Sequence, residues 1–545
     1  MRGNISRDYL NILSNLCKST EQKYLAILIL INIICNHIFF LNLKFYSDDW
    51  ILLYYTTFNN PTTYLTSERP LLFMLPNILQ ALFGQTALLY QISLIAETSL
   101  FLIIFYFCVK KILTQLNFEK SMLLSYITAL IFCVLPFKDE MYVWPTMASG
   151  NNFAVIMYLL MLYFFLYQNE KNHFFIYSLI CYAFAAFTYE VGLCLPIFIA
   201  IYCLIIQQKW LKEFISYCCI TGIYAVFRVH NTISASGALG HITNYDPAVT
   251  VATRGIDYYI NGGITYLTYS PTGLLNLSIL SIIVLVILDV AIAYLLYRSF
   301  DSIPTESIGD SKKLIKSIAV ALTLLFILAM PFIIRDGLTA FIGETRHAYL
   351  IETAVAVIII VFLIYLPLNV KTLNLKKILI ISVAFMLLIV NQGFYANWIP
   401  SGDFQEDINN LIQQNSKIIS QCDVVYFNSS SFKNEIHDTF VQDRKAGIGV
   451  YNSQPLTYWS LSKMLHNASF NGDAVIYASY NGVPFTNYKL LELTENELCY
   501  LNTATNETIT VDQNKVYEIN SSLLHDFKDK NTYRLISFES EKNSP

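Results

Sequence analysis

Charged residues are scarce in this chain. Asp, Glu, Lys and Arg make up 14% of its 545 residues, against about 25% in an ordinary soluble protein. The formal net charge of −4 is small and no basic stripe is present, so we expect no nucleic-acid partner. The sequence also has no paired Cys-x-x-Cys motif, which excludes the ligand spacing of a structural zinc site.

Long apolar runs take the place of the missing charge. Hydrophobic residues make up 55% of the chain, and its mean hydropathy is +0.47. Runs of about 18 apolar residues or more are long enough to cross the hydrocarbon core of a bilayer. The pattern predicts a polytopic α-helical membrane protein with about eleven spans, at residues 24–43, 87–108, 122–137, 151–168, 174–188, 191–206, 213–229, 273–297, 315–334, 348–366 and 377–396.

The distribution of Lys and Arg predicts the orientation of these spans. Most of these residues lie at the N-terminus and in the alternate loops that contain Lys110, Lys212 and Lys313. Because cytoplasmic loops carry the excess of positive charge, the N-terminus is expected inside. An odd number of spans then places everything after residue 397 outside. The usage of Lys, Asn and Ile favours a bacterial protein, and therefore an inner-membrane location with the functional face and C-terminal domain outside.

The composition divides the chain into three parts. We expect a multi-span domain over 1–396, a linker over 397–407 and a small extracytoplasmic α/β domain over 408–545. Within this last part, residues 407–421 are predicted to form a helix, and "CDVVYF", "DAVIYASY" and "TYRLISF" are predicted to form strands. Cys422 and Cys499 lie in this exported part, where they either pair or remain separate thiols.

Ionisable residues gather at the outer ends of the predicted spans. Acidic and basic groups at membrane depth are unfavourable and normally mark a functional site. All members of this set lie near the boundary on the same side, so they are candidates to face one cavity. The set comprises Asp48, Asp49, Asp139, Glu140, Glu190, Arg228, Arg335, Asp336, Glu344, Arg346 and His347.

Such a set suits the transfer of a group carried on a lipid phosphate. Asp48 is the preferred general base for an acceptor hydroxyl, with Asp49 in support. Arginines hold the departing phosphate through charge-assisted hydrogen bonds, and Arg346 is the preferred ligand, with Arg228 and Arg335 as alternatives. A divalent cation such as Mg²⁺ or Mn²⁺ shared by Asp49 and Glu140 is compatible with this chemistry but not required.

Each of these residues also has a purely structural interpretation. Asp48 and Asp49 are suitable residues for capping a helix. Glu140 is close enough in sequence to pair with Lys138. Glu190 lies between two apolar runs, where an unpaired solvated charge is unfavourable, so either a function or a buried ion pair is expected there. Arg346 would otherwise serve as an anchor at the level of the lipid head groups or as a partner of Glu344.

Several segments resemble the GT-C superfamily of glycosyltransferases, which use polyprenyl-phosphate-linked sugars. "YSDDW", followed by "ERPL" and "ALFG", is similar to the acidic first outer loop and interfacial helix of that superfamily. The resemblance is to the O-mannosyltransferase-like branch with bacterial relatives, and it covers roughly residues 24–366. "PFKDEMYVWP" places Glu140 at the acid position, "FTYEVGLCLP" aligns Glu190, and "GETRHAYL" aligns Glu344, Arg346 and Tyr349.

The resemblance implies an inverting glycosyltransferase that moves a sugar from a polyprenyl-phosphate carrier to a glycan, lipid or protein acceptor on the outer face of the membrane. It implies catalytic roles for Asp48, Asp49 and Glu140, and substrate contacts for the aligned Glu190, Glu344, Arg346 and Tyr349. Tyr189 stands where that branch usually has lysine, and Asn151 where arginine is common. A surface-polysaccharide polymerase or ligase with a diphosphate-linked donor is the main alternative, and a transporter is a further one.

Overall fold

The computed structural model describes residues 19–37, 44–45, 49, 69–234, 273–299, 311–334, 345–365 and 375–419, apart from isolated positions inside these ranges, together with Met464 and strand residues between 424 and 511. The chain divides into two compact units. We call residues 1–43 with 57–398 the helical unit, and residues 44–56 with 399–545 the sheet unit.

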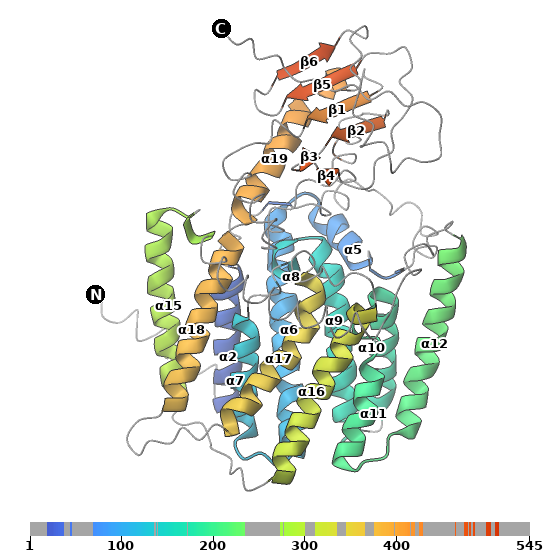
Figure 1. Cartoon of the computed structure of the whole chain (residues 1–545), viewed down its shortest axis with the longest axis vertical. Helices are drawn as coiled ribbons and strands as arrows, with labels where there is room; N and C mark the ends of the chain where they lie inside the picture. Colours follow the sequence, from blue (N-terminus) through green and yellow to red (C-terminus); the bar gives the residue numbers. More distant parts are fainter. Residues whose placement is uncertain are drawn as a thin grey trace. The chain divides into compact units, whose positions relative to one another are not determined.

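Helices occupy each of the eleven predicted apolar runs. The first run forms α2 (Thr20–Asn32), which continues into the π-helix η1 (Ile33–His37). The others are α6 (Ala87–Gln115), α7 (Ser121–Val134), α9 (Met147–Leu166), α10 (Phe174–Thr188), α11 (Leu195–Ile206), α12 (Leu211–Ser234), α15 (Ile279–Ser299), α16 (Ser311–Ile334), α17 (Thr345–Tyr365) and α18 (Leu375–Ala396). Two shorter helices, α5 (Met74–Phe83) and α8 (Glu140–Val143), lie at one end of these long helices (Figure 1).

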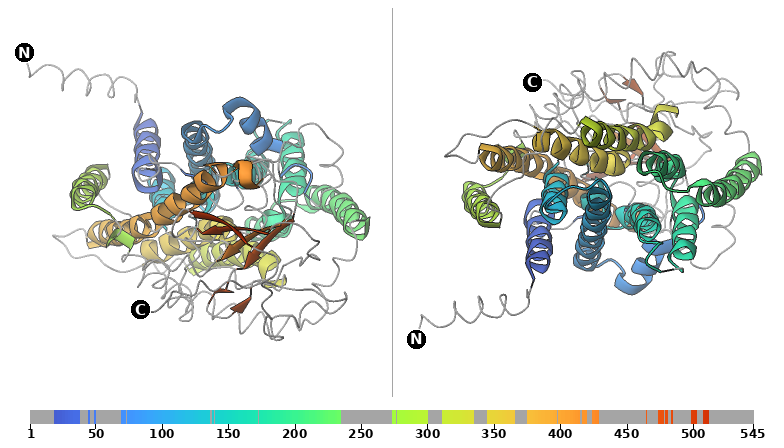
Figure 2. Two further views of the ribbon diagram at one scale, coloured as in Figure 1. Left: turned by 90° about the horizontal axis from the view of Figure 1, so that it is seen from above. Right: turned by 90° about the horizontal axis from the view of Figure 1, so that it is seen from below.

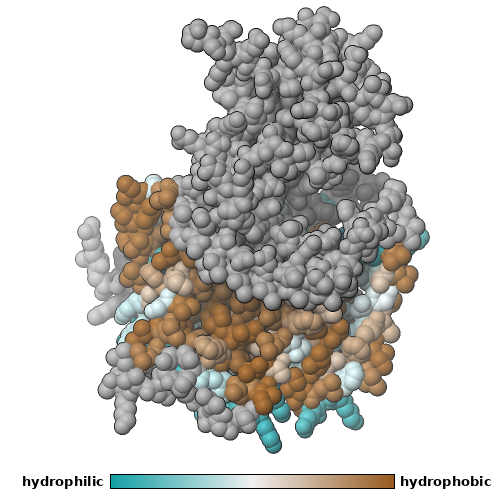
Figure 3. Space-filling view, viewed as in Figure 1, coloured by the Kyte–Doolittle hydropathy of each residue, from teal (hydrophilic) through white to brown (hydrophobic). Residues whose placement is uncertain are grey.

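Five of the described helices are both long and apolar enough to cross a membrane. They cover 87–115, 148–166, 279–298, 312–330 and 375–393, and several shorter apolar helices accompany them. This is consistent with an integral membrane protein. Apolar side chains also cover much of the described surface of the helical unit (Figure 3), and Val226, Leu280 and Phe362 are each more than 60% exposed. A surface of this kind is stable next to lipid, not next to water.

The central helices of this unit are α6, α7, α9 and α17. In the views along the helices, α12 and α15 lie at opposite edges, where α12 contacts α10 and α11 and α15 contacts α18 (Figure 2). Large aromatic side chains fill the interior, and their hydroxyl groups find polar partners there: Tyr182 Oη donates to the Leu193 carbonyl oxygen at 2.9 Å. Tyrosines therefore serve as core residues in this unit.

Local sequence signals explain several helix ends. Ser19 and Gln22 form a reciprocal capping box at the start of α2, with hydrogen bonds of 3.1 and 3.2 Å. Pro196 lies in the first turn of α11, where its missing N–H leaves no hydrogen bond unmade. α10 ends because Tyr189 adopts an extended conformation, which sets up the short 3₁₀ helix η4 (Glu190–Gly192).

The sheet unit contains a four-stranded sheet in the order β2-β1-β5-β6. β1 (Val424–Asn428) pairs in parallel with β2 (Asp473–Tyr477) and β5 (Leu498–Asn502), and β6 (Glu507–Val511) is antiparallel to β5. A separate antiparallel pair joins β3 (Ser479–Tyr480) to β4 (Val483–Pro484). The predicted strands "CDVVYF" and "DAVIYASY" correspond to β1 and to β2 with β3, whereas "TYRLISF" lies outside the described residues.

Most of the predicted linker is helical. α19 (Trp398–Gln414) covers 398–407, and α19 and α20 (Ser416–Ile419) cover most of the helix predicted at 407–421. In the sheet unit, Lys44 forms an ion pair with Glu406 of α19. This contact ties α19 to the segment that carries the predicted acidic pair. Cys499 lies in β5 opposite Thr510, while Cys422 is outside the described residues, so a disulfide between these cysteines stays a prediction.

Candidate functional site

Three charged side chains meet where α10 ends, α11 begins and α12 ends. The Arg69 guanidinium donates two hydrogen bonds to Glu190, from Nε to Oε2 at 2.8 Å and from Nη2 to Oε1 at 2.5 Å. Arg228 Nη1 lies 3.0 Å from Glu190 Oε1 and donates to Tyr224 Oη at 2.8 Å. We call Arg69, Glu190 and Arg228 the arginine–glutamate cluster.

The turn that carries Arg69 packs closely against α9 and α10. Arg69 lies in the turn that precedes α5, and the backbone N–H of Leu71 donates to the Phe187 carbonyl oxygen of α10 at 3.2 Å. Gly150 of α9 permits this approach, because a Cβ atom at that position would lie 2.3 Å from the Leu72 carbonyl oxygen. Any larger residue at position 150 would push the Arg69 turn away.

The three described side chains of the cluster carry one more positive than negative charge. Two guanidinium groups lie beside one carboxylate, so the formal charge of these three residues together is +1. Burial by itself lowers the pKa of Arg69, but the charge and hydrogen bonds of Glu190 outweigh burial and raise the pKa above its ordinary value. The Arg69 guanidinium also lies 4.5 Å from the centre of the Tyr189 ring, a cation–π contact. Arg69 is therefore permanently charged and fixed in position.

The cluster remains partly accessible. The side chains of Arg69, Glu190 and Arg228 are 24%, 23% and 30% exposed. A cationic, partly exposed group at the end of apolar helices suits a phosphate whose remaining part stays in lipid.

A tight contact holds the Glu190 turn. Tyr158 of α9 donates its hydroxyl hydrogen to the Tyr189 carbonyl oxygen at 2.9 Å. Its ring lies directly against Gly192, where a Cβ atom would come within 2.6 Å of the ring carbons. Tyr158 is fully buried. The direction of Glu190 therefore depends on Gly192, two positions later in the chain, and on the buried Tyr158 of α9.

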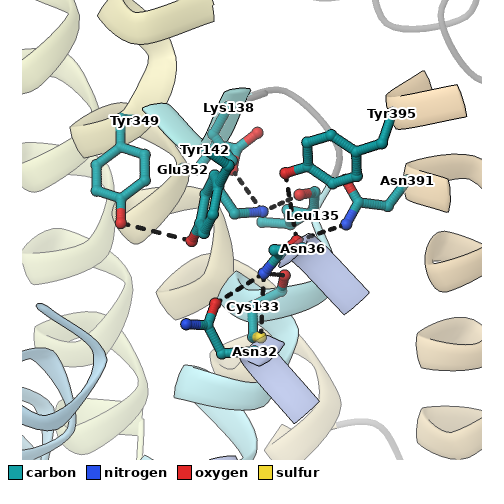
Figure 4. A network of polar contacts seen from close by, with 10 residues as sticks. All are labelled: Asn32, Asn36, Cys133, Leu135, Lys138, Tyr142, Tyr349, Glu352, Asn391 and Tyr395. Carbon is teal, nitrogen blue, oxygen red and sulfur yellow. Dashed lines mark hydrogen bonds and ion pairs between the residues drawn. The ribbon is translucent and has the colours of Figure 1, made fainter. Parts of the chain in front are cut away.

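The predicted segments around Glu140 and Arg346 lie next to each other. Lys138, just before α8, forms an ion pair with Glu352 of α17 at 3.6 Å and donates to the Leu135 carbonyl oxygen (Figure 4). Burial lowers the pKa of Lys138, and the charge of Glu352 opposes this effect. The hydroxyl groups of Tyr142 and Tyr349 are 3.5 Å apart. α8 and the first turns of α17 are thus joined by one ionic and one polar contact.

Buried amides extend this network between helices. Asn36 of the π-helix donates to Asn32 Oδ1 at 2.9 Å and to the Cys133 carbonyl oxygen at 3.2 Å. Its own Oδ1 accepts from Asn391 at 2.7 Å and from Tyr395 at 3.3 Å (Figure 4). A π-helical turn shifts side chains relative to an α-helix, and such turns are frequent at functional sites. Asn36 here joins α2, α7 and α18.

The structure brings together some of the predicted site residues. Glu190 and Arg228 lie in one cluster, in which Glu190 forms ion pairs with Arg69 and Arg228. Tyr349 is fully buried in the core, and the centre of its ring lies 4.6 Å from that of Phe101. It therefore packs against other side chains of the helical unit. Asp49 of the sheet unit is buried.

The other predicted site residues are described only in part or not at all. Glu140 and Arg346 are placed by their backbone alone, in α8 and α17. Asp48, Arg335 and Glu344 lie outside the described residues. Among the residues that are described, no group of three or more His, Cys, Asp or Glu side chains is arranged to hold a metal ion. Metal binding by Asp49 and Glu140 stays a prediction.

Arg69 is the residue that the sequence did not single out. The sequence indicated only that its segment "ERPL" leads into an interfacial helix. Its contact with Glu190 could not be predicted, because the two residues are 121 positions apart in the chain. A comparison with protein-family models and with curated proteins finds no match for this chain.

Proposed function

We propose that this protein is an inverting membrane glycosyltransferase. It moves a sugar from a polyprenyl-phosphate carrier to a glycan, lipid or protein acceptor at the outer face of the membrane. The arginine–glutamate cluster is the observation that supports this function most directly. It supplies a fixed positive charge at the level where a lipid-linked phosphate would lie.

The proposed topology has about eleven spans of a GT-C-like body, the N-terminus inside and the C-terminus outside. The four-stranded sheet and α19 then belong to a small extracytoplasmic α/β domain. The Lys44–Glu406 ion pair supports a link between this domain and the acidic segment 44–56. The inner membrane of a bacterium is the proposed location.

The proposed reaction is a single displacement at the anomeric carbon. The acceptor oxygen forms a bond to that carbon while the bond from the carbon to the phosphate oxygen breaks. Polyprenyl phosphate leaves with the electron pair, and the acceptor proton passes to the carboxylate of Asp48. Arg69 and Arg228 stabilise the negative charge that grows on the departing phosphate, and Glu190 keeps the two guanidinium groups in place.

Sugar transfer by the purified full chain in liposomes tests this proposal. Donors are a panel of polyprenyl-phosphate sugars, with Asp48→Asn and Arg228→Gln beside the wild type. We expect release of polyprenyl phosphate by the wild type, loss of turnover in Asp48→Asn, and a drop of about 100-fold in Arg228→Gln. Lys111→Gln is the control. Lys111, near the C-terminal end of α6, pairs with Glu170, which follows α9, and this pair lies at the end of these helices that is opposite to the arginine–glutamate cluster.

Three outcomes would contradict the proposal or its assignment of the base. Turnover only with diphosphate-linked donors would indicate a polysaccharide polymerase or ligase. Coupled flux of a solute across the liposome membrane, without consumption of any donor, would indicate a transporter. Equal activity of Asp48→Asn and wild type would remove Asp48 as the base.

A further inference from the structure

The four-stranded sheet of the sheet unit contains a topological switch point. In the order β2-β1-β5-β6, the chain leaves β1 toward β2 on one side and leaves β5 toward β6 on the other side (Figure 1). β1, β2 and β5 are parallel, so their carboxyl ends lie at one edge of the sheet. In open α/β sheets, ligands bind outside the carboxyl ends of the strands at such a switch point. The candidate position here is therefore the edge at which β1 and β5 end.

Both strands that flank this switch point end in asparagine. β1 ends at Asn428 and β5 at Asn502. The preceding residues of the two strands pair with each other, so the register places the two asparagines next to each other. Asn428 pairs with Tyr477 at the end of β2, and Asn502 pairs with Glu507 at the start of β6. We call these four residues the polar row. Residues opposite one another on neighbouring strands share a face of the sheet, so the polar row crosses all four strands on one face.

The polar row differs from the remainder of the sheet. The four other rows of paired residues consist of Val, Ile, Leu, Ala, Cys, Phe and Tyr, with at most one Asp or Thr in each. Strand residues of this apolar kind are typical of a sheet that is covered on both faces. Two asparagines, a glutamate and a tyrosine in a single row at the carboxyl edge do not follow from that packing. Their concentration at the switch point favours a binding role.

The residue types of the polar row suit a neutral ligand that is rich in hydroxyl groups. An Asn amide both donates and accepts hydrogen bonds, and a sugar hydroxyl group requires both. A Tyr ring provides an apolar surface for the C–H face of a sugar, together with a polar tip. Glu507 is the only charged member of the row, and the described strand residues of the sheet unit include no Lys or Arg. An anionic ligand is therefore disfavoured.

We propose that the carboxyl edge of this sheet binds a neutral oligosaccharide. Asn428 and Asn502 supply hydrogen bonds to its hydroxyl groups, Tyr477 supplies an aromatic ring, and Glu507 disfavours acidic glycans. At a strand spacing of about 4.8 Å, a row across four strands extends about 14 Å, so it spans more than one sugar unit. The identification of this oligosaccharide as the acceptor of the transfer reaction rests on the proposed function, whereas the binding itself does not.

Glycan binding by the full chain in lipid nanodiscs, without any sugar donor, tests this site. The labelled protein is applied to an array of neutral and acidic bacterial glycans, and the neutral glycan with the strongest signal is then titrated by calorimetry. We expect retention on neutral glycans. Asn428→Ala/Asn502→Ala should weaken binding by about 20-fold, because each neutral hydrogen-bonding group contributes about fivefold. Tyr477→Ala should also weaken binding, and Tyr477→Trp should retain it because an aromatic ring is still present.

Two further variants separate the polar row from a general effect on the fold. Asp473→Ala is the matched control, because Asp473 lies in the same strand as Tyr477 and four residues before it, on the same face but at the amino edge. It should bind the neutral glycan as the wild type does. Glu507→Lys reverses the charge of the row and should add retention on acidic glycans, a gain that misfolding does not produce.

Several results would overturn the proposal. They are no retention on any neutral glycan, a preference of the wild type for acidic glycans, and an equal loss of binding in Asp473→Ala and in Asn428→Ala/Asn502→Ala. Sugar transfer by a chain that binds no neutral glycan would refute this proposal and leave the glycosyltransferase standing. Neutral-glycan binding that is lost in the asparagine variant, without transfer from any donor, would support this proposal and count against the glycosyltransferase.

Discussion

The contact between Gly192 and Tyr158 yields a prediction that needs no assumption about function. In Gly192→Ala the new methyl group would lie 2.6 to 2.8 Å from three ring carbons of Tyr158. The ring is fully buried, so it has no free space to enter. Its hydroxyl group also bonds to the Tyr189 carbonyl oxygen at 2.9 Å, and any rotation of the ring breaks that bond.

The expected loss of stability in Gly192→Ala is the sum of the overpacking cost and the cost of the lost hydrogen bond. Overpacking of a buried site costs about 1–3 kcal/mol, and the loss of a neutral hydrogen bond costs about 1 kcal/mol more. We therefore expect Gly192→Ala to lower the free energy of unfolding by about 2–4 kcal/mol. Gly222→Ala is the matched control, since a Cβ atom at Gly222 in α12 meets nothing within 4 Å. It is expected to stabilise the helix by about 0.5–1 kcal/mol.

Unfolding of the purified chain in mixed detergent, with increasing dodecyl sulfate, measures both changes. Tyr158→Leu introduced into Gly192→Ala removes the obstructing ring, so the double variant should be less destabilised than the sum of the two single variants. If Gly192→Ala unfolds at the same dodecyl sulfate concentration as wild type while Gly222→Ala is normal, the close packing inferred here is wrong. An equal loss in both alanine variants would also refute it.

Two ion pairs give the remaining predictions. Arg69→Gln and Glu190→Gln should each lower the free energy of unfolding by about 2 kcal/mol. Because the partly buried pair is bidentate, a double-mutant cycle should give a coupling free energy of about 1–3 kcal/mol. Additive losses would mean that the pair is not formed. Lys138→Met removes the ammonium group that pairs with the buried Glu352 and should cost about 3–5 kcal/mol. Lys138→Met with Glu352→Leu should recover most of that stability. The same detergent titration measures both, and failure of the second substitution to rescue the first would contradict the assigned pair.

The sequence predicted the helices well because their signal is local. An apolar run of 18 residues has to bury its backbone hydrogen bonds internally, and only a helix does so within one segment. The strands β5 and β6 escaped prediction for the opposite reason. "LCYLN" and "ETITV" are short, and pairing with β1 and with each other, not their own composition, makes them strands. Most of the segment expected to be a linker, 398–407, is helical in α19, which passes through Pro400 and Gly402.

The site was predicted less completely because its contacts are between distant segments. Glu190 and Arg228 stood out as charges at the edges of apolar runs. Arg69 did not, since its turn lies outside the spans and its partner is far along the chain. Lys138 was considered as a partner of the neighbouring Glu140, and its contact with Glu352 depends on how α17 packs against α7 and α8. Only the three-dimensional arrangement assigns such partners.

The two ionic groups of the helical unit differ in charge balance and in exposure. Lys138 and Glu352 form a pair of one positive and one negative charge. Their side chains are 0% and 3% exposed, so no ligand reaches them in this conformation. The arginine–glutamate cluster has two positive charges for one negative charge, and its side chains are 23% to 30% exposed. Charge balance inside a buried pair minimises the electrostatic cost of burial. An accessible excess of positive charge brings no comparable structural benefit but attracts an anionic ligand. For this reason the arginine–glutamate cluster is a better candidate than the Lys138–Glu352 pair to bind the phosphate of the proposed donor.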